Sequence, residues 1–193
     1  MKFLQKLRKQ AGFTMIELLI VISILGILAV AVLAAINPVE QINRGRDTSS
    51  QSDAEQLISA VDRYNAFKGY YPWLEDANDT ANPVSALVEI ENVDDGAGCS
   101  ILEKLAGGDG ASCDGTDELK STFITRVSDP DARPLYVYNE GGTGDATYVC
   151  FEPQSQAFKT QAIERCDAGL PGDVGQTAES MICDDGNELI CLP

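Results

Sequence analysis

The chain has 193 residues, of which 14 are basic, 30 are acidic and none is histidine. Without histidine, Ser-His-Asp triads, Cys-His nucleophiles and most catalytic zinc sites are excluded. The acidic excess repels the phosphates of nucleic acids, and no basic cluster in the sequence offsets it, so no contact with nucleic acid is expected.

The amino terminus differs from the rest of the chain in charge. Residues 1–12 (MKFLQKLRKQAG) contain four basic residues and no acid, whereas ten basic and thirty acidic residues follow. From Leu18 to Ile36 the chain runs through 19 uncharged, mainly apolar residues. As a helix this stretch is about 28 Å long, which matches the apolar core of a bilayer. Because flanking basic residues stay on the cytoplasmic side, the carboxy-terminal part is expected outside.

One acidic residue interrupts the apolar block that begins at Phe13. A carboxylate such as that of Glu17 costs roughly 2.5–3.5 kcal/mol at mid-membrane depth and less near the interface. A simple anchor or a secretory signal peptide has no use for it, although Ala29-Val30-Ala31 has the pattern of a signal-peptidase site. The alternative is that Glu17 reaches the lipid head groups beside an ordinary anchor helix.

The block GFTMIELLIV, from Gly12 to Val21 behind a basic leader, resembles the prepilin signature of type IV pilins and type II secretion pseudopilins. The resemblance covers essentially residues 1–36. It implies that a prepilin peptidase cuts between Gly12 and Phe13 and methylates the new amine of Phe13. It also implies that the apolar helix stays on the mature protein. Type IV pilins often carry a proline eight residues after the glycine that Gly26 matches, and here that position is Ala34.

The residues of this block suit such an assembly. Gly12 has no side chain, which lets a protease approach the backbone. Among apolar helices, the Phe13 amine and the Glu17 carboxylate are each costly alone and tolerable as a pair. If the amine of one copy meets Glu17 of the next, the contact does not close on itself and gives an open helical polymer. Gly26 permits close helix packing or, as in type IV pilins, marks a point where the helix loosens on assembly.

The rest of the chain predicts an α+β fold. Apolar residues recur with helical spacing over roughly 39–67, so the apolar helix is expected to continue, after a kink at Pro38, into an amphipathic helix that ends at Gly69. Two strands are predicted at Leu135–Tyr138 and Thr147–Phe151, and a small antiparallel sheet would bury the apolar stripe of the helix, as in pilins.

Weaker signals predict three further elements. Ser100 and Glu103 form a capping-box pattern at the start of a short helix. Thr116 is expected to cap another helix that carries Leu119 and Phe123. A third strand is predicted near 157–163.

All six cysteines lie in the carboxy-terminal half, and none forms a C-x-x-C pair: Cys99, Cys113, Cys150, Cys166, Cys183 and Cys191. An even number after a membrane segment predicts disulfides in an oxidising compartment. Six cysteines permit 15 connectivities. We expect sequential pairing, 99–113, 150–166 and 183–191, because each pair then closes a short loop.

Acidic turns at 94–96, 109–110, 114–118 and 184–188 offer carboxylate oxygens of the kind that bind calcium, and the resemblance implies the same for some pseudopilins. None has the EF-hand spacing, and acidic turns are usually solvated, so no cofactor is expected. No phosphate-binding loop or nucleophile elbow is present in the sequence, and no enzymatic activity is expected.

The sequence therefore predicts a basic leader peptide (1–12), a transmembrane and polymerisation helix (13–37) and an extracytoplasmic pilin-like globular domain (38–193). We expect a structural subunit of a type IV pilus or pseudopilus, which crosses the cell membrane once before it joins an extracellular filament. Its expected partners are other copies of itself, prepilin peptidase, the pilus or secretion assembly machinery and membrane lipid. The alternatives are a membrane-anchored binding domain that never polymerises, and a secreted domain released by signal peptidase.

Overall fold

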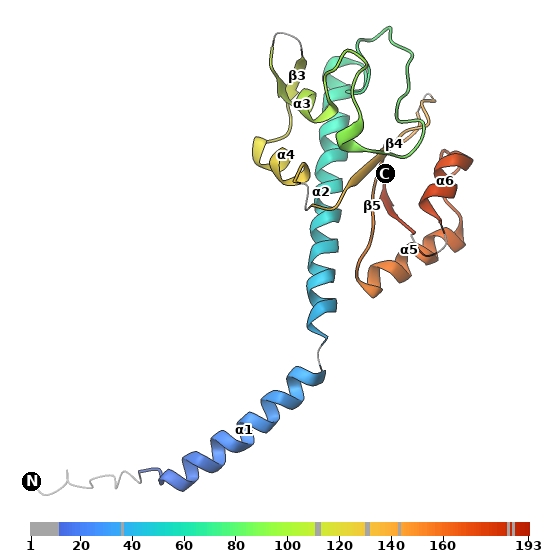
Figure 1. Cartoon of the computed structure of the whole chain (residues 1–193). Helices are drawn as coiled ribbons and strands as arrows, with labels where there is room; N and C mark the ends of the chain where they lie inside the picture. The colour runs from blue at the N-terminus through green and yellow to red at the C-terminus, as the bar shows by residue number, and fades with distance from the viewer. Residues whose placement is uncertain are drawn as a thin grey trace, which may run out of the picture. The chain divides into compact units, whose positions relative to one another are not determined.

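The computed structural model describes residues 12–193 apart from residues 36, 111–112, 130–131, 143, 185 and 187 (Figure 1). Residues 1–11 of the predicted leader lie outside the described part. The chain divides into two compact units, one ending at Val39 and the other beginning at Glu40.

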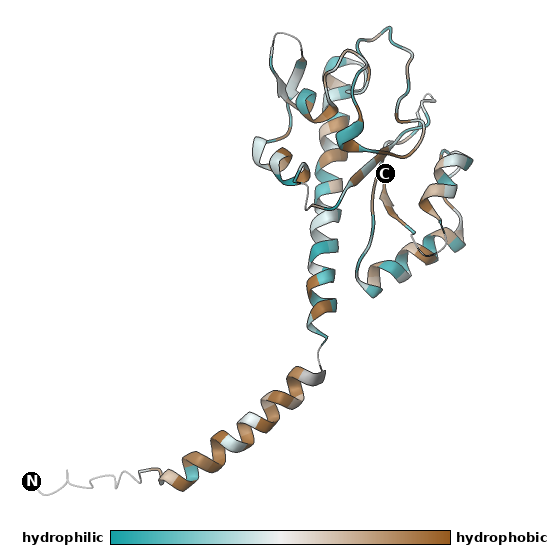
Figure 2. Ribbon diagram, viewed as in Figure 1, coloured by the Kyte–Doolittle hydropathy of each residue, from teal (hydrophilic) through white to brown (hydrophobic). Residues whose placement is uncertain are grey.

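The amino-terminal unit is built on one helix, α1 (Met15–Ala35). The side chains of this helix are mainly apolar on all its faces, and Glu17 is its one charged residue (Figure 2). All its described side chains, from Met15 to Leu33, are exposed. The helix is long and apolar enough to cross a membrane. Since an apolar surface of this extent is unfavourable in water, α1 requires lipid or other protein chains around it.

The second unit is organised around α2 (Pro38–Lys68). Proline suits the first position of a helix, where its missing N–H has no partner to lose, and Pro38 is the first residue of α2. The predicted amphipathic helix is confirmed. Gly69 has a positive φ of 82° and its N–H bonds to the carbonyl of Asn65, as expected for the helix end.

A four-stranded antiparallel sheet has the strand order β1 (Val88–Glu89), β4 (Leu135–Tyr138), β5 (Tyr148–Phe151) and β6 (Ile190–Leu192). The two predicted strands are confirmed as its centre, with Leu135 opposite Phe151 and Tyr138 opposite Tyr148. The edge strands are short and come from distant parts of the chain. The fold is therefore α+β and pilin-like, with a long apolar helix, a second helix and a small antiparallel sheet.

Both faces of this sheet are buried. On β4 and β5, Val137 and Val149 join the apolar cluster that contains α2, whereas Tyr138 and Tyr148 join a second cluster with Ile182 of α6. This alternation follows from the two-residue period of a strand. The central strands are therefore covered on both faces, which explains why they are apolar throughout.

The remaining elements connect or cover this core. They are η1 (Ile90–Asn92), α3 (Ile101–Leu105), β2 (Ala106–Gly108), β3 (Asp114–Asp117), α4 (Ser121–Val127), α5 (Gln156–Ala168) and α6 (Gln176–Ile182). The predicted capping box is present at α3, where Glu103 N–H bonds to Ser100 Oγ at 3.2 Å and Ser100 N–H to Glu103 Oε2 at 3.1 Å.

Two of the weaker predictions are wrong. The segment near 157–163 belongs to helix α5, because Ser155 caps its first turn and carboxylates of α2 accept its free N–H groups. Thr116 lies in β3, which pairs with β2, so the helix that carries Phe123 begins only at Ser121.

The predicted disulfide pairing is correct for one bond and wrong for two. Cys99 pairs with Cys113 as expected. Cys150 pairs with Cys191, and Cys166 with Cys183. Cys150 and Cys191 are directly opposed on β5 and β6, so strand pairing, rather than closeness in sequence, selects this partner.

Candidate assembly site

Among the described residues of the first unit, the one charged side chain, Glu17, lies at the start of α1. Gly12, Phe13 and Thr14 precede the helix, and Phe13 is 84% exposed. A side-chain carbon placed on Gly12 would have no neighbour within 4 Å. The backbone on either side of the Gly12–Phe13 bond is thus open to an approaching protein.

Thr14 and Glu17 form a reciprocal hydrogen-bonded box at this end. The N–H and the hydroxyl of Thr14 donate to Glu17 Oε2 at 2.9 and 2.8 Å, and the N–H of Glu17 donates to Thr14 Oγ1 at 3.2 Å. This is the capping-box geometry, which satisfies N–H groups that have no partner within the helix. The carboxylate of Glu17 is therefore held in one orientation by its own chain.

Within the described part of the chain, the box leaves the charge of Glu17 without an opposite partner. Among the ion pairs of the described residues, none involves Glu17. Thr14 is neutral, and both of its bonds reach the same oxygen, Oε2. A cation supplied from outside the described chain therefore finds an oriented carboxylate at the end of an apolar helix.

Farther along α1, the polar groups are satisfied internally. Ser23 Oγ donates to the carbonyl of Leu19 at 2.7 Å, as a hydroxyl in an apolar environment must. Gly26 lies within continuous helix, and its open side has room for a close neighbour. The lateral surface of α1 thus offers apolar packing, and its first turn offers one oriented charge.

The structure brings together the predicted processing and assembly residues: Gly12, Phe13 and Glu17 lie within six positions at the start of α1. Thr14 is the residue that sequence reasoning missed. The signal was available, because Thr14-Met-Ile-Glu17 has the T-x-x-E spacing of a capping box.

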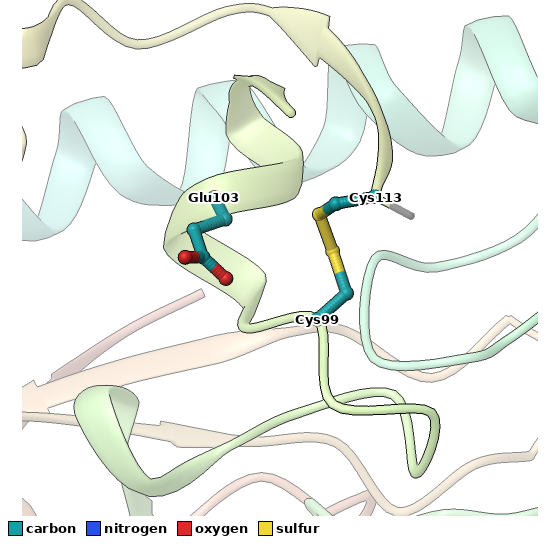
Figure 3. Close-up of side chains that lie close together, drawn as sticks. All are labelled: Cys99, Glu103 and Cys113. Carbon is teal, nitrogen blue, oxygen red and sulfur yellow. A yellow bond between two sulfur atoms is a disulfide. The ribbon is translucent and has the colours of Figure 1, made fainter. Parts of the chain in front are cut away.

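One group of side chains in the second unit has the composition of a metal site. Cys99, Glu103 and Cys113 lie close together, but Figure 3 shows the two sulfur atoms joined in a disulfide. Disulfide sulfur is not a thiolate and does not ligate zinc. Glu103 meanwhile accepts the hydrogen bonds of the α3 capping box.

Several carboxylates of the acidic turns already have partners within the chain. Asp95 pairs with Lys104 at 2.8 Å, Asp114 with Lys68 at 2.7 Å and Glu118 with Arg63 at 2.7 Å. Burial raises the pKa of Asp95, but hydrogen bonds from Lys104 and from backbone N–H groups outweigh it and hold that pKa below its usual value. These turns thus have a structural role of their own.

Comparison with known proteins matches only the amino-terminal segment. The family model described as the prokaryotic N-terminal methylation motif matches residues 7–33. Neither the curated proteins nor the solved structures gave a significant match to the chain. The matched residues include Gly12, Phe13, Thr14 and Glu17. The chain therefore carries, on residues 7–33, the prepilin motif of type IV pilins and pseudopilins.

Proposed function

We propose that the chain is a structural subunit of a type IV pilus or a related pseudopilus. A prepilin peptidase cuts between Gly12 and Phe13 and methylates the Phe13 amine. The mature subunit crosses the membrane once, with residues 38–193 outside, and joins an extracellular filament through α1. The observation that carries the proposal is the single oriented carboxylate of Glu17 on a fully exposed apolar helix.

This geometry supports a pairing of charges between neighbouring subunits. In the filament, the amine of Phe13 from one subunit neutralises Glu17 of its neighbour, because neither charge is tolerable alone among apolar side chains. The exposed leucine, isoleucine and valine side chains of α1 supply adhesion, at roughly 1.5–3 kcal/mol for each side chain that becomes buried. The charge pair fixes the axial register of the apolar packing.

A glutamine substitution tests this pairing against a purely local role of Glu17. Glu17→Gln keeps the capping box, since glutamine serves equally at that position, but removes the negative charge. We expect the variant to insert in the membrane at the wild-type level and to form few or no filaments, and we expect the same of Glu17→Ala. The readout is electron microscopy and immunoblotting of the sheared fraction. If Glu17→Gln forms filaments at the wild-type yield, Glu17 acts only as a helix cap and the charge pairing is wrong.

A further inference from the structure

We propose that the globular domain carries a cationic groove between α2 and α4 that binds the acidic α5–α6 lobe of a neighbouring copy of this chain. The proposal rests on the proposed function and adds to it a second contact between subunits, outside the membrane helix. The groove comprises two adjoining cavities of about 570 and 340 Å³, and Arg126 lines both.

Basic residues are concentrated at this groove. After Gly12 the chain has ten basic and thirty acidic residues. Half of these basic residues line the two cavities: Arg46, Arg63, Lys120, Arg126 and Arg133. Asp53, Glu55 and Glu118 are the acidic residues among the lining side chains. The groove is thus net positive on a domain that is strongly negative.

Two arginines of the groove are held in place yet still available. Arg63 pairs with Glu118 at 2.7 Å and Arg126 with Asp53, while their side chains stay 53% and 54% exposed. A guanidinium has five N–H donors, so each arginine keeps several for a further acceptor. Because the intramolecular pairs already order these side chains, less conformational entropy is lost when a carboxylate binds.

Of the other three cations of the groove, Arg133 pairs with buried Asp47, and two have no ion-pair partner among the described residues. Lys120 and Arg46 are exposed, and neither takes part in an ion pair of the described residues. The polar run of α2 around Ser49, Ser50 and Ser52 lines the same cavities and offers hydroxyl groups. Cations with spare donors beside hydroxyls suit a surface rich in carboxylates.

The complementary surface is on the same domain. Residues 156–193 contain seven acidic residues against Lys159 and Arg165, and Glu164, Asp167 and Glu179 are exposed. Figure 1 shows α4 on one side of α2 and α5 and α6 on the other. When two surfaces of opposite charge lie on opposite sides of one domain, the groove of one copy can bind the lobe of the next. Such a head-to-tail contact suits an open polymer. Without such a contact, subunits of this negative charge repel one another.

The test uses filaments of the full chain and two matched substitutions. Lys120→Glu reverses a charge in the groove, and Lys159→Glu makes the same change on exposed α5, within the acidic lobe. Filaments are sheared from cells, incubated in increasing NaCl, and pelleted. We expect Lys120→Glu to leave at least about threefold less pelletable subunit than wild type at physiological salt. We expect Lys159→Glu to leave at least as much as wild type, because it adds negative charge to the lobe that the groove binds.

A compensating change completes the test. Adding Glu164→Lys and Glu179→Lys to Lys120→Glu restores unlike charges and should recover part of the lost filament. Equal yields from Lys120→Glu and Lys159→Glu would overturn the groove contact and leave the proposed function intact. Absence of filaments from wild type would overturn both. Dextran sulfate serves as a polyanionic probe. If filaments of Lys120→Glu are as stable as wild type but no longer bind it, the groove binds a polyanion and not a neighbouring subunit.

Discussion

The carboxylate of Asp47 on α2 accepts a hydrogen bond from the backbone N–H of Ser155 at 2.8 Å, across 108 positions of sequence. The same side chain, fully buried, accepts from the N–H of Gln154 and pairs with Arg133. Seven residues earlier on α2, Glu40 accepts from the N–H of Gln156 at 2.9 Å. Two acids of one helix thus fix the start of α5, where partial positive charge accumulates.

Replacing Asp47 should destabilise the globular domain. Asp47→Asn keeps the shape of the side chain but leaves Arg133 without a counter-charge, and we expect a loss of about 2–4 kcal/mol in the free energy of unfolding. Asp53→Asn is the matched control on the same helix, because its partner Arg126 is half exposed and the expected loss is about 0–1 kcal/mol. Denaturant unfolding of the purified full chain in detergent, followed by circular dichroism, measures both. Equal losses would contradict the anchoring role.

The same carboxylate predicts a pH dependence. Burial raises the pKa of Asp47, but hydrogen bonds from Ser155, Arg133 and Gln154 outweigh it, so the pKa lies below its usual value. A depressed pKa contributes stability above the unfolded-state value, which is about 3.9, and this contribution is lost as pH falls through the folded-state value. We expect the wild type to lose stability below about pH 4 and Asp47→Asn to lose less over that range. A parallel decline of the two proteins would argue against Asp47 as the titrating group.

Thr14 should matter for assembly through the orientation of Glu17. Thr14→Ala removes the hydroxyl of the capping box and should weaken the first turn of α1 by about 1 kcal/mol. We expect fewer filaments with unchanged membrane insertion, measured as for Glu17→Gln. Thr14→Ser keeps the hydroxyl and should restore the yield. If serine fails as alanine does, the hydroxyl is not what position 14 contributes.

The disulfides can be mapped directly. Non-reducing proteolysis and mass spectrometry should recover the peptide pairs 150–191 and 166–183 together with 99–113. Removal of the bond across β5 and β6 by Cys150→Ala with Cys191→Ala should cost about 4 kcal/mol, since the bond closes a separation of 41 residues. Recovery of a 150–166 pair would contradict the sheet arrangement.

The sequence alone predicts the elements of this chain that depend on interactions between residues close in the sequence. The apolar run of α1, the spacing of α2, the box at Ser100 and the strands Leu135–Tyr138 and Thr147–Phe151 each depend on near neighbours. These elements have strong periodicity or fixed offsets.

The parts that sequence misses depend on distant partners. Helix α5 is helical because Asp47 and Glu40, more than 100 positions away, accept its N–H groups. Strand β6 has three residues and forms against β5, which also decides the partner of Cys150. The cationic groove combines α2 with α4, so its charges are scattered in the sequence and only the fold gathers them.

The proposed function depends above all on processing of the chain as a prepilin that keeps α1 for assembly. Amino-terminal sequencing and intact-mass measurement of the protein purified from its host's filament and membrane fractions test it most directly. We expect a mature chain that begins at Phe13 and is heavier by one methyl group on its amine. An intact Met1, or a chain that begins after Ala31 or Ala35, would contradict it.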